Sequence, residues 1–93
     1  MINKVKLALR ITTDAFDSEI SDLILAAITD LRIAGVVPGE GEDYDQIVQR
    51  AIITYCKMNF GLPEDYDRLK RSYDEQKAQL SNATGYTEWG RRA

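Results

Sequence analysis

The chain contains no histidine, one cysteine and two prolines among its 93 residues. Without histidine, the commonest general base and the commonest metal ligand are both missing. A single cysteine cannot form a disulfide within the chain, which fits a reducing cytoplasm. Scarce proline and the lack of strand-like alternation favour an all-α fold.

No apolar run approaches the ~20 residues needed to cross a bilayer, and no signal peptide opens the chain, so we expect no membrane partner. An apolar content of 44% and a charged content of 29% are typical of one soluble globular domain. The net charge of −3 argues weakly against a nucleic-acid surface, because phosphate binding usually requires a basic field.

Residue types that carry chemistry are present, but not in a catalytic arrangement. Cys56 lies among apolar residues and is best interpreted as a core side chain. The glycines Gly35, Gly39 and Gly41 lack the Lys-Ser/Thr pair of a phosphate-binding loop. The acidic residues are spread over caps, a loop and helix surfaces. We therefore expect no enzyme activity, no cofactor and no metal site.

The stretch from Asp43 to Gly61 has apolar residues over roughly two-thirds of a helix circumference. We therefore expect a central buried helix at about 43–61, packed on at least two sides. Asp43 is a candidate N-cap, with Gln46 three residues later. Gly61 and Pro63 supply the signals that end the helix.

Three further helices are expected around this one, at about 2–11, 15–34 and 62–80. In the first helix Leu7 lies on a different face from Val5, so we expect neighbours on both sides. Residues 12–14, Thr-Thr-Asp, are expected to cap the second helix. The result is a small four-helix bundle of residues 1–81, followed by a flexible tail of residues 82–93.

The fourth helix has a narrow apolar face, and its other residues are mostly charged and expected to be exposed to solvent. The apolar face consists of Tyr66, Leu69, Tyr73 and Leu80, and the pairs Glu64–Arg68 and Asp67–Arg71 have the i,i+4 order that supports an exposed helix. We expect this to be the least buried of the four helices.

The second helix carries a second apolar seam on its outer side, formed by Leu25, Thr29 and Ile33 and joined by Ala26. Scattered surface hydrophobics are one interpretation, since such residues are normal on soluble proteins. Contact with another subunit is the other interpretation.

The tail holds two aromatic residues and two arginines, Tyr86, Trp89, Arg91 and Arg92. Aromatic and arginine side chains together are typical of binding anchors, which favours docking onto a partner. The alternative is that Tyr86 and Trp89 fold back onto the bundle.

Two other functions fit an all-α chain. A small helical DNA-binding regulator could use Arg68, Lys70 and Arg71, but acidic residues lie between them, and a long loop replaces the ~3–4-residue turn of a helix-turn-helix. A helical adaptor of another bacterial complex would share nearly every feature of the sequence.

Taken together, the helices resemble the head–tail connector proteins of tailed bacteriophages and prophages. The resemblance covers approximately residues 4–81 and rests on Lys6, Leu9-Arg10-Ile11, Asp14, Asp17, Leu23-Ile24, Ala26-Ala27, Ala51-Ile52, Tyr55, Phe60-Gly61 and Ser72-Tyr73.

The resemblance implies a structural virion protein that assembles in the host cytoplasm as a ring below the portal. Such a ring extends the channel for double-stranded DNA, which passes without sequence-specific binding, and docks a stopper or tail protein. A ring needs two different patches per subunit. We expect Leu25, Thr29 and Ile33 in one patch and the exposed face of the fourth helix in the other, with the tail residues docking a partner.

Overall fold

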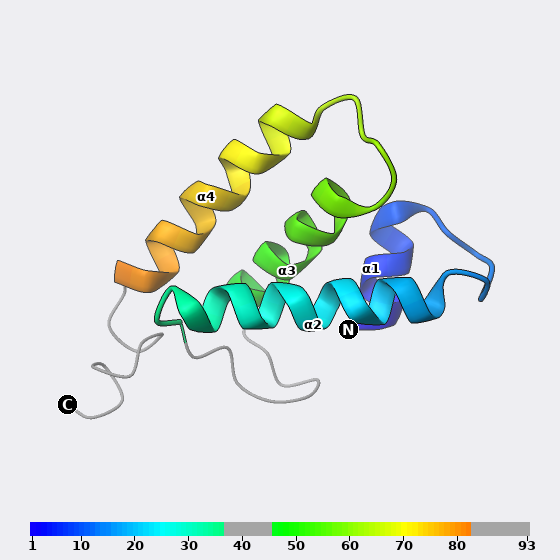
Figure 1. Cartoon of the computed structure of the whole chain (residues 1–93), viewed down its shortest axis with the longest axis horizontal. Helices are drawn as coiled ribbons and strands as arrows, with labels where there is room; N and C mark the ends of the chain where they lie inside the picture. Colours follow the sequence, from blue (N-terminus) through cyan, green and yellow to red (C-terminus); the bar gives the residue numbers. More distant parts are fainter. Residues whose placement is uncertain (37–45, 83–93) are drawn as a thin grey trace.

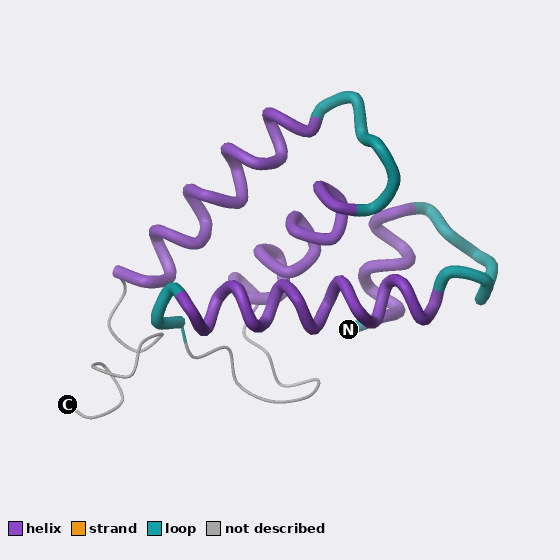
Figure 2. Tube along the Cα trace, viewed as in Figure 1, coloured by secondary structure: helices purple, strands orange, loops and turns teal. Residues whose placement is uncertain are grey.

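The computed structural model describes residues 1–36 and 46–82. Its regular elements are four α-helices: α1 (Ile2–Leu9), α2 (Asp17–Ile33), α3 (Gln46–Asn59) and α4 (Tyr66–Asn82). Figure 2 shows that the described residues outside these helices form connecting loops and turns. The all-α fold with four helices is therefore confirmed.

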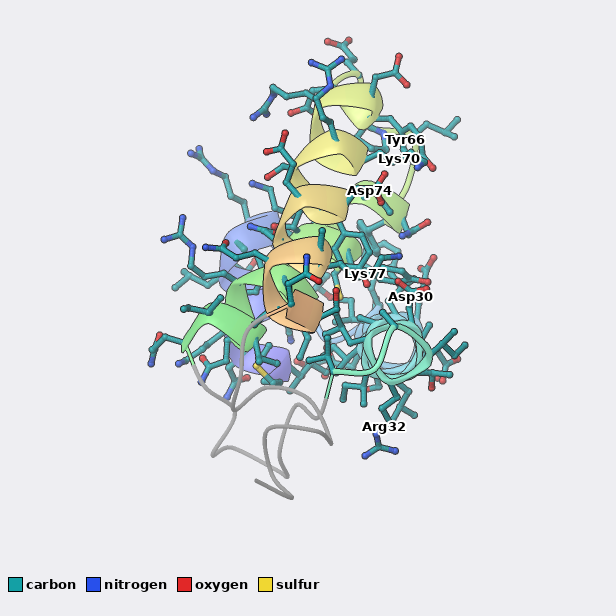
Figure 3. All side chains as sticks on the ribbon, turned by 90° about the vertical axis from the view of Figure 1, so that its left-hand side faces the viewer. Asp30, Arg32, Tyr66, Lys70, Asp74 and Lys77 are labelled. Carbon is teal, nitrogen blue, oxygen red and sulfur yellow. The ribbon has the colours of Figure 1, made fainter. Side chains whose placement is uncertain are left out.

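The helices are arranged around α3, with α1 and α4 on opposite sides of it in Figure 1. Helix α2 lies across them, and α3 contacts each of the three other helices. A short loop reverses the chain between α3 and α4. The last turn of α4 thereby comes back beside the end of α2, and both Figure 1 and Figure 3 show the two ends next to each other.

One hydrophobic core joins all four helices. Its buried members are Val5, Ile20, Ile24, Ala27, Ile28, Leu31, Val36, Val48, Ala51, Ile52, Cys56, Met58, Leu69, Tyr73 and Leu80. The α2 members recur every three or four residues, so they form one stripe along that helix. The core face of α2 is therefore fixed by its sequence.

The expectation that α3 is a central buried helix is not confirmed. The helix contacts all its neighbours, but Ile47, which belongs to its apolar surface, is 44% exposed, like the polar residues Gln46, Arg50 and Lys57. One face of α3 consequently lies in solvent. Asp43, the expected N-cap, lies outside the described residues. Gly61 does adopt the left-handed conformation expected after the helix, with φ +68°.

The connection from α1 to α2 differs from the expected one. Helix α1 ends at Leu9, where Arg10 turns left-handed with φ 59°. Leu7 is 79% exposed, so α1 is not clamped from both sides. The N-cap of α2 is Phe16, without a side-chain cap bond, and the Asp14 carboxylate instead pairs with Lys6 at 2.9 Å. That pairing raises the pKa of Lys6 and lowers the pKa of Asp14.

Replacing a core residue of α2 should cost far more stability than replacing one on its outer face. We expect Ile20→Ala to lower the free energy of unfolding by about 2–5 kcal/mol, because Ile20 is fully buried and a cavity would remain. Ile33→Ala, the matched control, should change it by less than about 0.5 kcal/mol. Urea unfolding of dilute protein measures both, and equal losses would contradict this assignment of the two faces.

Candidate subunit and docking surfaces

The outer side of α2 presents apolar side chains to solvent. Leu25 is 62% exposed and Ile33 is 81% exposed, with Ala26 and Thr29 also exposed between them. The Thr29 hydroxyl donates to the Leu25 carbonyl oxygen at 2.9 Å, so its hydrogen-bonding demand is met within the helix. We call these four residues the α2 outer seam.

Burial of the core face of α2 fixes the rotation of the helix and so keeps the outer seam exposed to solvent. Ile20, Ala27 and Leu31 are fully buried. Rotating the helix to bury Leu25 or Ile33 would bring these side chains out of the core, at a cost of about 1.5–3 kcal/mol for each large one. A single chain therefore cannot bury both faces of α2 by turning the helix.

A polar cluster ties α4 to α2 next to this seam. The Tyr73 hydroxyl donates to Asp30 Oδ2 at 2.6 Å, and Lys77 Nζ donates to the same oxygen at 3.2 Å. The Lys77 ammonium also lies 5.3 Å from the centre of the Tyr73 ring. Figure 3 shows Tyr66, Lys70, Asp74 and Lys77 in a row along α4, with Asp30 of α2 at its foot. We call Asp30, Tyr73 and Lys77 the Asp30 clamp.

Burial, together with the hydrogen bond to Asp30, raises the pKa of Tyr73 above its ordinary value. The hydroxyl thus remains a proton donor throughout the physiological range. The helical period of apolar residues places Tyr73 on an apolar face and does not reveal its partner. A signal was available, because a buried tyrosine usually needs a hydrogen-bond partner and Lys77 follows one turn later.

The outer side of α4 is charged and forms a shallow, open hollow. The hollow is lined by Asp67, Lys70, Arg71, Asp74, Glu75 and Ala78. Besides Lys77–Asp30, the described residues of α4 and its approach make the ion pairs Lys70–Asp74, at 2.9 Å, and Arg68–Asp65. The expected pairs Glu64–Arg68 and Asp67–Arg71 are not among them, and Arg68 instead reaches back to Asp65 just before the helix.

The other candidate residues of the sequence do not join these surfaces. Tyr86, Trp89, Arg91 and Arg92 lie outside the described residues. Cys56 is fully buried on α3, and burial raises the pKa of its thiol to about 12. Such a thiol stays protonated and unreactive at neutral pH.

Two kinds of feature are absent from the described residues. No group of three or more His, Cys, Asp or Glu side chains there could hold a metal ion. Among the helices that the structure describes, none combines the length and the apolar character needed to traverse a lipid bilayer.

Comparison with known proteins identifies a family. A family model described as "Phage connector protein" matches residues 1–87, which extends beyond α4 by five residues. Searches of curated proteins and of solved structures gave no significant match.

Removing the Tyr73 hydroxyl should weaken the attachment of α4. We expect Tyr73→Phe to lower the free energy of unfolding by about 1–2 kcal/mol, because Asp30 loses one of its two donors. Tyr66→Phe is the matched control, since Tyr66 is partly exposed at the start of the same helix. Urea unfolding near neutral pH distinguishes the two variants.

The pH dependence offers a second readout of the same hydroxyl. Tyr73 has a raised pKa in the folded chain, so above its ordinary value of 10.0 the unfolded chain releases this proton first. The stabilisation is therefore complete below pH 10 and is lost as the pH rises further. The decline should be shallower in Tyr73→Phe. An identical decline in both chains would contradict the role of this hydroxyl.

Proposed function

Because the chain belongs to the phage connector protein family, whose members are structural proteins of the phage head–tail junction, we propose that copies of it form a ring below the portal. The ring extends the channel for double-stranded DNA and docks a stopper or tail protein. Assembly takes place in the host cytoplasm, and the ring then remains in the virion. The helical residues 1–81 build the ring in this proposal.

The strongest structural support is the exposed outer seam of α2. Leu25 and Ile33 keep large apolar side chains in solvent on a helix whose opposite face is fully buried. A neighbouring copy would remove these side chains from water, which contributes about 25 cal/mol for each Å² of apolar surface. A subunit contact therefore explains the seam better than scattered surface residues do.

A closed ring requires a second patch that differs from the first, because each subunit meets its two neighbours head to tail. The α4 hollow is suited to this role. Its lysine and arginine carry long aliphatic stems that can cover apolar side chains while their charges remain in water. The Asp30 clamp holds the hollow at a fixed position relative to the seam within each subunit.

Charge complementarity supports the same pairing. Glu19 and Asp22 are exposed near the start of α2, on the outer side of the helix. Arg71 lines the α4 hollow, and no ion pair among the described residues uses any of these three side chains. In a ring, Arg71 of one copy would face Glu19 and Asp22 of the next, which fixes register more than it adds affinity.

The proposed position between head and tail implies three further partners, namely the portal, the stopper and the DNA. Tyr86, Trp89, Arg91 and Arg92 dock the portal or the stopper in the assembled particle, where aromatic and arginine side chains act as anchors. The net charge of −3 suits a conduit through which DNA slides without being held.

Charged substitutions in the outer seam should block assembly. Wild-type protein should form a ring-sized species as its concentration rises, alone or with portal present. Ile33→Asp should raise the concentration at half-assembly by about ten-fold to a hundred-fold, because burial of one isoleucine contributes about 1.5–3 kcal/mol at each contact. Sedimentation velocity measures both.

The matched control is Leu7→Asp, since Leu7 is 79% exposed on α1, outside both proposed patches. It should assemble as the wild type does. A wild-type chain that stays monomeric even with portal present would overturn the ring, and equal defects in both variants would overturn the assignment of the seam.

A further inference from the structure

The α2 outer seam has a second occupant within reach. We propose that residues 83–93 dock along the α2 outer seam of their own chain before assembly, and that a neighbouring copy displaces them when the ring forms. The docking step stands on its own, while the displacement step rests on the proposed function. By occupying the seam, this segment would regulate assembly.

The segment starts next to the seam. Helix α4 ends at Asn82, and its last turns are anchored to α2, since Lys77 bonds Asp30 at 3.2 Å and Leu80 is buried in the core. Figure 1 and Figure 3 both place the end of α4 beside the end of α2. Helix α4 therefore ends beside the end of α2 that carries Ile33.

The distances along α2 suit the length of the segment. At about 100° per residue, Ile33 lies about 60° around the helix from Asp30, the residue that faces α4. Leu25 lies about 12 Å further along the axis. An extended chain covers up to about 3.3–3.6 Å per residue, so residues 83–93 span up to about 35 Å. The segment can therefore run from Ile33 past Leu25 toward the start of α2.

The order of aromatic residues and arginines along the segment matches the order of aliphatic residues and carboxylates along α2. In a polyproline II conformation, which has three residues per turn and a rise of about 3.1 Å, Tyr86 and Trp89 would lie on the same side of the segment about 9 Å apart, near the spacing of about 12 Å between Ile33 and Leu25. Beyond Trp89 come Arg91 and Arg92, and beyond Leu25 come Asp22 and Glu19, both exposed. Aromatic side chains thus meet aliphatic ones, and arginines meet carboxylates, when the segment runs antiparallel to α2.

Tethering favours the chain's own seam over the seam of another copy at low concentration. A short flexible connection gives an effective concentration in the millimolar range. A neighbouring copy at micromolar concentration therefore displaces the tethered segment from the seam only if it makes a larger contact surface than the segment does. The α4 hollow supplies that surface, and Arg71 of the neighbour would take the carboxylates that Arg91 and Arg92 release.

The family match stops at residue 87, so Trp89, Arg91 and Arg92 lie beyond the matched region. Docked on the seam, these side chains would hold monomers apart until assembly. After displacement the same aromatic and arginine side chains are free to dock a partner in the particle.

Trp89 is the only tryptophan, so its fluorescence reports on the segment directly. The full-length protein, diluted until sedimentation shows a monomer, should emit at a shorter wavelength than the same protein in denaturant. Ile33→Asp should move the emission of the folded monomer to that of a solvent-exposed indole. Leu62→Asp is the control, because Leu62 is 99% exposed in the loop at the opposite end of α4, and it should leave the emission unchanged.

The same variants report on assembly. Trp89→Ser should lower the concentration at half-assembly several-fold, because the neighbour no longer competes with the segment. Solvent-exposed emission in the wild-type monomer, or an unchanged emission in Ile33→Asp, would overturn the docking. A short-wavelength emission that appears only together with oligomers would place the segment on another copy and would also overturn it.

The two proposals fail in different ways. If the ring proposal is wrong, neither wild type nor Trp89→Ser assembles, while the emission shift of the monomer persists. If the docking proposal is wrong, wild type assembles but Trp89 emits as an exposed indole at every dilution that gives monomer.

Discussion

Helix α2 carries apolar side chains on two opposite faces, and one chain can bury only one of them. Ile20, Ala27 and Leu31 occupy the core, which leaves Leu25 and Ile33 in solvent. The cost of exposing the core face exceeds any gain from turning the helix, so the seam is a fixed property of the folded subunit. Both proposed contacts, the tail segment before assembly and the neighbour after it, follow from this constraint.

The Asp30 clamp adds a second constraint, because it determines where α4 lies relative to the seam. Tyr73 and Lys77 share one carboxylate oxygen of Asp30, and the rings of Tyr73 and Tyr55 of α3 pack in an edge arrangement with 5.3 Å between ring centres. The clamp therefore connects three helices. Two patches held on such connected helices present a constant angle to their neighbours, which a closed ring requires.

Much of this organisation could be predicted from the sequence, because a 3.6-residue period of apolar side chains is a local signal. That signal gave four helices and placed Leu25 and Ile33 on an outer face. Contacts that depend on the tertiary fold were not predictable: Tyr73 and Asp30 are 43 positions apart, and Lys4 bonds Gln49 at 2.6 Å across 45 positions. The burial of α3 was overestimated for the same reason, since composition does not reveal which apolar face lacks a neighbour.

The central claim is that the outer seam of one copy meets α4 of the next. Photo-crosslinking from position 33 tests it directly, with a photoreactive phenylalanine in place of Ile33 and equal amounts of isotope-labelled and unlabelled chains in the assembled protein. We expect crosslinks between differently labelled chains, from position 33 to residues 67–78 of α4. Crosslinks from position 33 to position 33 would mean a two-fold contact that cannot build a ring, and would contradict the account.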